Sequence, residues 1–305
     1  KLIKKIFKSE QRPDKNITLD LEHKVSLVAL KNLQYALRLF YENVIKVAKN
    51  EYPNDYLKVV PRLFSLHTWV GYDVDGRGDI SWIDTFSKRL IVKIEQLEIY
   101  VDNLKNVKES LQRNKKIYEK LSKLEMYLIN AIKVNKKIYN DLTENGLLNN
   151  SEKLKEVSNY IYTNSKKILT SSRFLIDSID IILELIQKNH FENKTKVLNK
   201  LQLTKIEISN FGLGLAKTQV RLNSSQLNNA ISKEINLLGD PNDPSNKNTY
   251  INSVSKLIDK VKPVNINFGN LADENMNAKR YFMILAQALK YIDSEQPIRF
   301  LIAEC

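Results

Sequence analysis

The sequence predicts a mostly α-helical protein, a bundle of long helices that leads into the first strands of an α/β barrel of the TIM type. Three observations favour this class. Only 8 glycines and 7 prolines occur in 305 residues, too few for the frequent turns of an all-β protein. Apolar residues recur at intervals of three and four over long segments, which is the spacing of a helix face. Two short apolar runs, 211–221 and 298–304, have strand character and are separated by helical segments.

The composition excludes several protein classes. The net charge is +13, but only ten of the 48 basic residues are arginines, and the lysines are spread singly or in pairs along polar helix faces. This pattern favours a solvated surface over a nucleic-acid interface. A single cysteine, Cys305, rules out an intramolecular disulfide framework and suits a reducing compartment. No apolar run reaches the roughly 20 residues of a membrane span, so we expect a cytoplasmic protein.

The first two thirds of the chain predict a helical region with one irregular interruption. Pro53 helps to end the first helix, Ser81 is a candidate N-cap, Asn114 marks a break, and the Asn145-Gly146 pair is a stop signal. Residues 51–81 are irregular and contain three of the eight glycines. The predicted helices cover about 20–50, 81–112, 114–142, 151–168, 171–189 and 194–210.

The last third predicts the beginning of the barrel. A buried strand at 211–221 is followed by helices at about 224–237, 249–262 and 276–292 and by a second buried strand at 298–304. Strands separated by helices are expected to be parallel and joined by crossovers. We therefore divide the chain into a helical region, 1–210, with a glycine-aspartate loop at 69–81, and a barrel region, 211–305. Because the chain starts at Lys1 and ends just after an apolar strand, we expect a fragment of a longer protein.

Arg221 is the leading candidate for a binding residue. It stands at the carboxyl end of the first predicted strand, where barrels of this type place functional side chains. Its planar guanidinium can hold a phosphate or a carboxylate through two parallel hydrogen bonds. The alternative is a structural arginine that pairs with a nearby carboxylate of the protein.

The loop at 69–84 is the second candidate site. Asp73, Asp75, Gly78, Ile80 and Asp84 match positions one, three, six, eight and twelve of an EF-hand calcium loop. Three features oppose this match: Arg77 puts a cation at position five, Asp84 is shorter than the bidentate glutamate usual at position twelve, and an entering helix is lacking. The alternative is a tight glycine turn whose carboxylates cap backbone N–H groups or pair with arginines, followed by a helix that starts at Ser81.

The other motifs carry no chemistry. His23, His67 and His190 are far apart and do not have metal-ligand spacing. The sequence contains no Walker loop, dinucleotide-binding fingerprint or nucleophile elbow.

Three segments resemble the phosphoenolpyruvate carboxylase family. The segment 56–82 resembles the family's loop in which a tryptophan precedes a Gly-Gly-Asp-Arg-Asp-Gly-Asn-Pro run. The segment 211–221 is similar to a Phe-Gly strand that ends in Asp-Ile-Arg, and 298–305 looks like the next barrel strand. The three matches occur in the family's order and span most of the chain. The motif loop consists of Trp69, Gly71, Asp73, Asp75 and Gly76, which match the family, and Arg77, which does not.

The resemblance implies a lyase of carbon dioxide fixation that supplies the tricarboxylic acid cycle. Such an enzyme joins phosphoenolpyruvate to bicarbonate and gives oxaloacetate and phosphate, with Mg²⁺ holding the enolate. Arg221 falls on the family arginine that contacts the substrate phosphate. The family's catalytic histidine would precede residue 1, and its metal ligands would follow Cys305, so the fragment would be inactive alone. The resemblance also implies a homotetramer that binds neither nucleic acid nor membrane.

The chain departs from the family pattern at several positions, which leaves open whether the parent protein is active. The alternatives are an inactive relative of the carboxylases, a helical scaffold or interaction protein, and the calcium-binding module. In the loop, Tyr72 replaces the family's second glycine, Val74 its arginine, Arg77 its asparagine and Gly78 its proline. Beside Arg221, Gln219 replaces an aspartate and Leu222 a glutamine.

Overall fold

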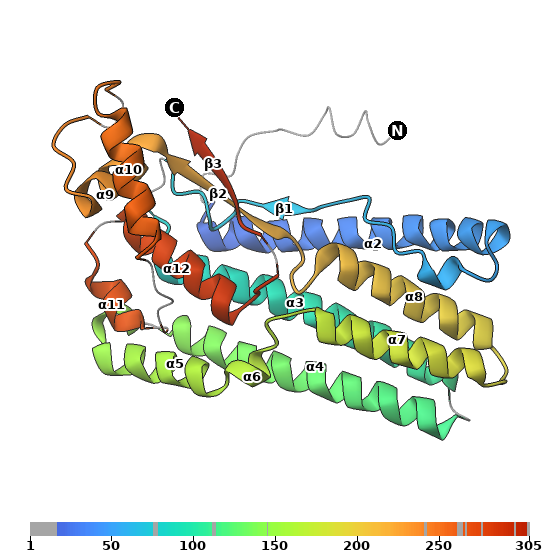
Figure 1. Ribbon diagram of the computed structural model, residues 1–305. Coiled ribbons are helices and arrows are strands. Elements are labelled where there is room, and N and C mark those ends of the chain that lie inside the picture. The colour runs from blue at the N-terminus through green and yellow to red at the C-terminus, as the bar shows by residue number, and fades with distance from the viewer. Residues whose placement is uncertain are drawn as a thin grey trace, which may run out of the picture.

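The protein is mostly helical, with a small parallel sheet (Figure 1). The computed structural model describes residues 17–75, 79–111, 114–144, 146–240, 243–260, 265, 267–275, 277–295 and 297–303. The helices are α2 (Leu19–Glu51), α3 (Trp82–Lys108), α4 (Lys115–Leu142), α5 (Ser151–Thr163), α6 (Ser165–Ile168), α7 (Arg173–Lys188), α8 (Lys194–Phe211), α9 (Ser224–Glu234), α10 (Lys247–Ile258), α11 (Phe268–Asp273) and α12 (Asn277–Tyr291). The strands are β1 (His67–Thr68), β2 (Lys217–Asn223) and β3 (Arg299–Ala303).

The long helices begin where the sequence predicts them, because their caps are strong. The Ser81 side chain accepts a hydrogen bond from the Asp84 N–H, and the Asp84 carboxylate accepts one from the Ser81 N–H, which completes a capping box at the start of α3. The Asn114 side chain caps α4 in the same way, by accepting from the Ile117 N–H. Thr18 caps α2. The three longest helix predictions are confirmed within a few residues.

Two helix predictions need correction. The segment 151–168 forms two helices instead of one, because Asn164 ends α5 by bonding back to Tyr160 through both its N–H and its side-chain amide. Leu169 then adopts a left-handed φ of 61°, which ends α6. The short helix α11 was not predicted, since six residues are too few to show a helical period.

The three strands form one parallel sheet in the order β1-β2-β3. Parallel pairing of the two predicted strands is therefore confirmed. The predicted start of the first strand is wrong: Phe211 is the last residue of α8, Gly212 turns the chain, and β2 begins at Lys217. The prediction that the second strand is buried is also wrong, because Phe300, Leu301 and Ile302 of β3 are each more than two fifths exposed. The three strands of the described residues form an open sheet and do not close into a barrel.

Helix α3 is central to the core. One hydrophobic cluster fills the space between α3, α4, α7 and α8, with Tyr100, Leu121 and Ile179 almost fully buried. A second cluster joins the start of α3 to the sheet and to α11 and α12, through Phe86, Val220 and Phe268 among others. The second cluster links residues on both sides of position 210, while the division at that position stays a prediction.

Two surfaces of the fold are apolar and open. On the outer face of α2, five large side chains at helical spacing are between 42% and 65% exposed: Leu21, Val25, Val28, Tyr35 and Leu39. Strand β3 pairs with β2 along one edge and carries exposed apolar side chains. Large open apolar surfaces of this kind commonly mark places where further protein packs.

A buried polar cluster ties α3 to the chain that leads into β3. The Lys93 ammonium donates to the carbonyl oxygens of Ile168, Leu169 and Ile292 at 2.8, 2.6 and 2.6 Å. These carbonyls lie at the ends of α6 and α12, so one cation satisfies two helix C-termini. Burial lowers the pKa of Lys93 to about 7, and the nearby Asp293 carboxylate opposes that shift.

Arg89 extends this cluster to the start of β2. Its guanidinium bonds the Asp293 carboxylate at 2.5 Å and the Ala216 carbonyl at 2.9 Å. Gly214 lies against it, because a β-carbon at that position would be only 2.8 Å from Arg89 Nη1. Gly214 is one of two glycines in the segment 211–221, which the sequence predicts to be a strand, and the close approach of Arg89 explains why a glycine occurs there.

His23 gives the fold a pH dependence. It is 4% exposed, its Nε2 atom has no hydrogen-bond partner, and burial, followed by the charge of Lys88, lowers its pKa to about 4, against an opposing effect of Asp20. In the unfolded chain the pKa is about 6.5. Between pH 6.5 and 4 the unfolded state therefore binds more protons, so stability falls as the pH falls through this window.

We expect the free energy of unfolding to lose about 2.5 kcal/mol from this histidine between pH 7 and pH 4.5. Denaturant titrations of the wild type and of His23→Leu at both pH values measure it. Other groups titrate in both proteins, so the contribution of His23 is the difference between the two proteins in how much their free energy of unfolding changes with pH. Equal slopes would show that its pKa is not lowered in the folded state.

Candidate functional site

The glycine-aspartate loop follows β1 and is shaped by two short-range constraints. The Tyr72 N–H donates to the Trp69 carbonyl at 2.8 Å, which closes a tight turn. Gly71 has a φ of +88°, and a β-carbon there would approach Lys88 Cγ to 2.9 Å. Both the left-handed conformation and the close neighbour therefore require glycine at this position. Trp69 is about half exposed, whereas Tyr72 is buried.

The loop continues the sheet along β2. The Arg221 N–H donates to the Tyr72 carbonyl at 3.2 Å, and the Val74 N–H donates to the Arg221 carbonyl at 3.1 Å. Asp73 and Arg221 thus form a parallel bridge, and on the other side Arg221 pairs with Leu301 of β3. Three segments that are far apart in the sequence meet at this point of the sheet.

Arg221 contacts one carboxylate and stays partly exposed. Its Nη1 atom donates to Asp73 Oδ2 at 3.1 Å, and the side chains are 41% and 17% exposed. This is the carboxylate pairing that one sequence alternative predicted. It uses one of the five N–H donors of the guanidinium, and a partly exposed pair of this kind contributes at most about 1 kcal/mol. The other carboxylate oxygen, Asp73 Oδ1, is buried and has no hydrogen-bond partner.

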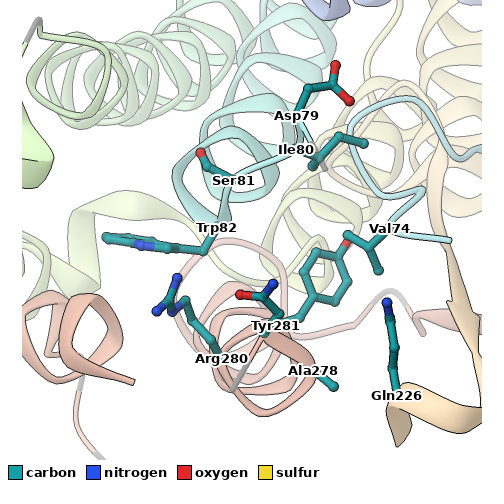
Figure 2. Close-up of a pocket in the computed structure, with 10 residues that line it drawn as sticks. Val74, Asp79, Ile80, Ser81, Trp82, Gln226, Ala278, Arg280 and Tyr281 are labelled. Atoms are coloured by element: carbon teal, nitrogen blue, oxygen red, sulfur yellow. The ribbon is translucent and has the colours of Figure 1, made fainter. Parts of the chain in front are cut away.

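A cavity of about 380 Å³ begins at Val74, the residue after Asp73, although neither Asp73 nor Arg221 lines it (Figure 2). Its volume suits a small ligand. Val74 and Gln226 line one side, and Trp82 and Arg280 line the other. The remaining lining residues come from the start of α3, the residues just before it, and the first turns of α12: Asp79, Ile80, Ser81, Asn277, Ala278 and Tyr281.

Arg280 is a second cation of the site that the sequence reading missed. Its Nη2 atom donates to the Glu274 carbonyl, and its Nε atom is buried without a hydrogen-bond partner. The beginning of α12 reaches the loop only through tertiary packing, so no local pattern could have identified this residue. Its charge faces one carboxylate in the cavity lining, Asp79, while Arg221 lies outside the lining and pairs with Asp73.

Two buried phenols stay neutral at this site. Burial raises the pKa of Tyr72 to about 12 and raises the pKa of Tyr281 further still. Neither can act as a base near pH 7. Tyr281 lines the cavity as a polar, uncharged group, whereas Tyr72 lies outside the lining, beside Thr85 and Arg89.

The remaining predicted residues of the loop lie apart from this geometry. Asp75 is half-buried in the loop. Gly76 and Arg77 lie outside the described residues, as do Gly78 and Cys305. The contacts of the loop disfavour the calcium alternative, because Asp73, its first position, pairs with Arg221, and Asp84, its twelfth, belongs to the capping box.

The described part of the chain holds no group of three or more His, Cys, Asp and Glu side chains arranged to bind a metal ion. The residues present therefore do not fit an Mg²⁺ site by themselves. Asp73 could supply at most one oxygen ligand through its unpartnered Oδ1.

Comparison of the chain with protein-family models, with curated proteins and with solved structures finds no match. Among the described helices, none combines the length and the apolar character needed to cross a lipid bilayer.

Proposed function

We propose that this chain is part of a phosphoenolpyruvate carboxylase in which Arg221 binds the phosphate of phosphoenolpyruvate. One observation carries the proposal. The three segments that resemble the family lie side by side, as the loop after β1, strand β2 and strand β3, and all three run parallel. Parallel strands bring their carboxyl ends to one edge, which is where α/β enzymes bind their substrates.

The charges at this edge suit the substrate. Phosphoenolpyruvate carries a phosphate and a carboxylate, and the reaction adds anionic bicarbonate. A guanidinium at Arg221 can bind phosphate oxygens and stabilise the negative charge that develops on them as phosphate leaves. Asp73 would hold the guanidinium in place, and Arg280 would supply a second positive charge. Mg²⁺, when bound in the enzyme, would stabilise the enolate, and its ligands would come from outside the described residues.

The open surfaces of the fold support a longer protein. The exposed apolar side chains of α2, and the outer edge of β3, which pairs with no second strand among the described residues, are surfaces that additional barrel strands and helices would cover. By the same resemblance we propose that the enzyme is a cytoplasmic homotetramer that binds neither nucleic acid nor membrane.

A second candidate is an inactive relative of the carboxylases, or a helical scaffold. The ion pair between Arg221 and Asp73 favours it, because the arginine already has a protein carboxylate as partner. Tyr72 and Val74 also stand where the family has glycine and arginine, and the Tyr72 side chain is buried in the core cluster that contains Phe86.

The complete protein that contains this chain is expected to form oxaloacetate from phosphoenolpyruvate, bicarbonate and Mg²⁺. A coupled assay that reduces oxaloacetate measures the rate, and omission of bicarbonate is the control for other routes of phosphoenolpyruvate breakdown. We expect the rate to depend on all three components. A folded, complete protein without this activity would favour the inactive relative.

A further inference from the structure

A groove lined by lysines lies at the end of the molecule opposite the carboxyl end of β2. It lies between the last turns of α2 and the first turns of α8, at the right of Figure 1. Its volume is about 690 Å³, within the range of small-molecule sites. The half-buried or exposed lysines Lys46, Lys49, Lys196 and Lys200 line it, over the buried apolar side chains of Ile45 and Leu203.

The charges in the groove are unbalanced. The lining holds four lysines and one carboxylate, Glu42, which also lies 3.9 Å from Arg38. Outside the lining, the charge of Glu109 acts on Lys200 in the opposite direction to that of Arg38. Lys200 donates to the Asn106 carbonyl at 3.0 Å, and Lys49 lies over the Tyr56 ring at 5.9 Å, but neither contact neutralises a charge. Burial, and then the charge of Lys196, lower the pKa of Lys200. A bound anion would relieve this repulsion.

Polar groups around the lysines can also bind an anion, by donating hydrogen bonds to it. The Asn199 side chain lines the groove, and its carbonyl oxygen is buried without a hydrogen-bond partner. If its amide is turned over, the NH₂ group takes that place and can donate to a ligand. Asn193 precedes the 18-residue helix α8 and makes no side-chain capping bond. The backbone N–H groups and the dipole of that helix end add positive potential.

We infer that this groove binds a small phosphorylated metabolite. Several lysines along one groove suit a phosphate with more than one negative charge, and the apolar floor and the volume leave room for the rest of such a molecule. A nucleic acid would need a longer basic stripe with aromatic side chains interleaved. The site is separate from Arg221, so the inference is independent of the proposed function.

Inorganic pyrophosphate is the probe for the test, measured by isothermal titration against the complete protein at constant ionic strength. The double variant Lys49→Ala/Lys200→Ala is expected to bind it at least tenfold more weakly than the wild type. Asn199→Asp, which adds a negative charge to the wall without removing a lysine, is expected to weaken it similarly. Circular dichroism establishes that each variant is folded.

Two controls separate this site from other causes. Lys116→Ala/Lys120→Ala removes the same charge from the exposed face of α4, and Arg221→Ala removes the arginine of the other site. Both are expected to leave pyrophosphate binding in the groove unchanged. If the α4 variant loses as much affinity as the groove variant, or if the groove variant binds like the wild type, only diffuse surface charge attracts the probe and the inference is overturned.

Discussion

Replacement of Lys93 by methionine is expected to lower the free energy of unfolding by about 3–5 kcal/mol. Methionine fills a similar volume but donates no hydrogen bond, so the carbonyls of Leu169 and Ile292 would be left buried without the donor they have now. The Ile168 carbonyl would keep its hydrogen bond from the Asn135 side-chain amide at 3.0 Å. Each orphaned acceptor costs about 1–3 kcal/mol. The change also removes the positive charge that stabilises the ends of α6 and α12.

Urea unfolding of both proteins measures this effect, and an unchanged slope would show that the variant reaches the same native state. Lys105→Met is the matched control. It lies on the same helix, half exposed, with only a 3.3 Å contact to Asp102, and is expected to change stability by less than about 0.5 kcal/mol. A Lys93→Met protein within about 1 kcal/mol of the wild type would mean that desolvation of the ammonium cancels its hydrogen bonds.

The junction at Lys93 also bears on the site, because it fixes the chain that leads into β3. Next to it, the Ser294 N–H donates to the Thr170 carbonyl at 2.8 Å, and the Glu295 carboxylate accepts from the Ser172 N–H at 2.8 Å. These contacts hold the segment between α12 and β3 against the helical bundle. Loss of Lys93 is therefore expected to loosen β3 as well as the core.

The long helices could be predicted from the sequence because their signals agree. In α3 and α4 the apolar period continues for more than seven turns, and Ser81 and Asn114 cap their first turns. Their start points follow from those caps. The irregular segment between α2 and α3 was predicted from its glycines, but the two-residue strand β1 within it was not, since two residues show no alternation.

The strands were less predictable, because tertiary contacts decide them. Phe211 completes the buried stripe of α8, Leu213 and Leu215 are buried in the turn that follows, and Gly214 allows the approach of Arg89, so none of these residues belongs to β2. Strand β3 has an apolar sequence that indicates burial, yet it stands at the sheet edge with its side chains exposed. An apolar sequence indicates that a strand can be buried, but it does not show whether another segment packs against the strand.

The site could be predicted only in part. The position of Arg221 after a strand pointed to it as a binding residue, and the glycine-aspartate loop was identified by its own pattern. The 3.1 Å contact between Arg221 and Asp73 joins residues that are 148 positions apart, so no local sequence pattern indicates it. Arg280 enters from α12 and has no sequence signal of its own.

Arg221→Ala is expected to lower kcat/KM for phosphoenolpyruvate by about 10²–10³-fold in the complete protein, the usual cost of removing one stabiliser of developing charge. The loss should not come from unfolding, because the partly exposed pair with Asp73 contributes at most about 1 kcal/mol to stability. Arg221→Lys keeps the charge but loses the planar fork, and it is expected to recover only part of the rate.

Asp73→Asn separates a binding arginine from a structural one. If Arg221 only pairs with Asp73, then Arg221→Ala and Asp73→Asn both break that pair and should lower kcat/KM equally. If Arg221 binds phosphate, Asp73→Asn leaves the guanidinium in place and should lose much less activity. The exposed Arg62→Ala variant controls for the loss of one positive charge elsewhere on the surface.

The most direct measurement is the dissociation constant of phosphoenolpyruvate for the complete protein and for its Arg221→Ala variant, by isothermal titration with Mg²⁺ present. We expect binding to weaken at least tenfold in Arg221→Ala and to stay unchanged in Arg62→Ala. Equal affinities of the wild type and a folded Arg221→Ala protein would contradict a phosphate-binding role and leave Arg221 as the structural partner of Asp73.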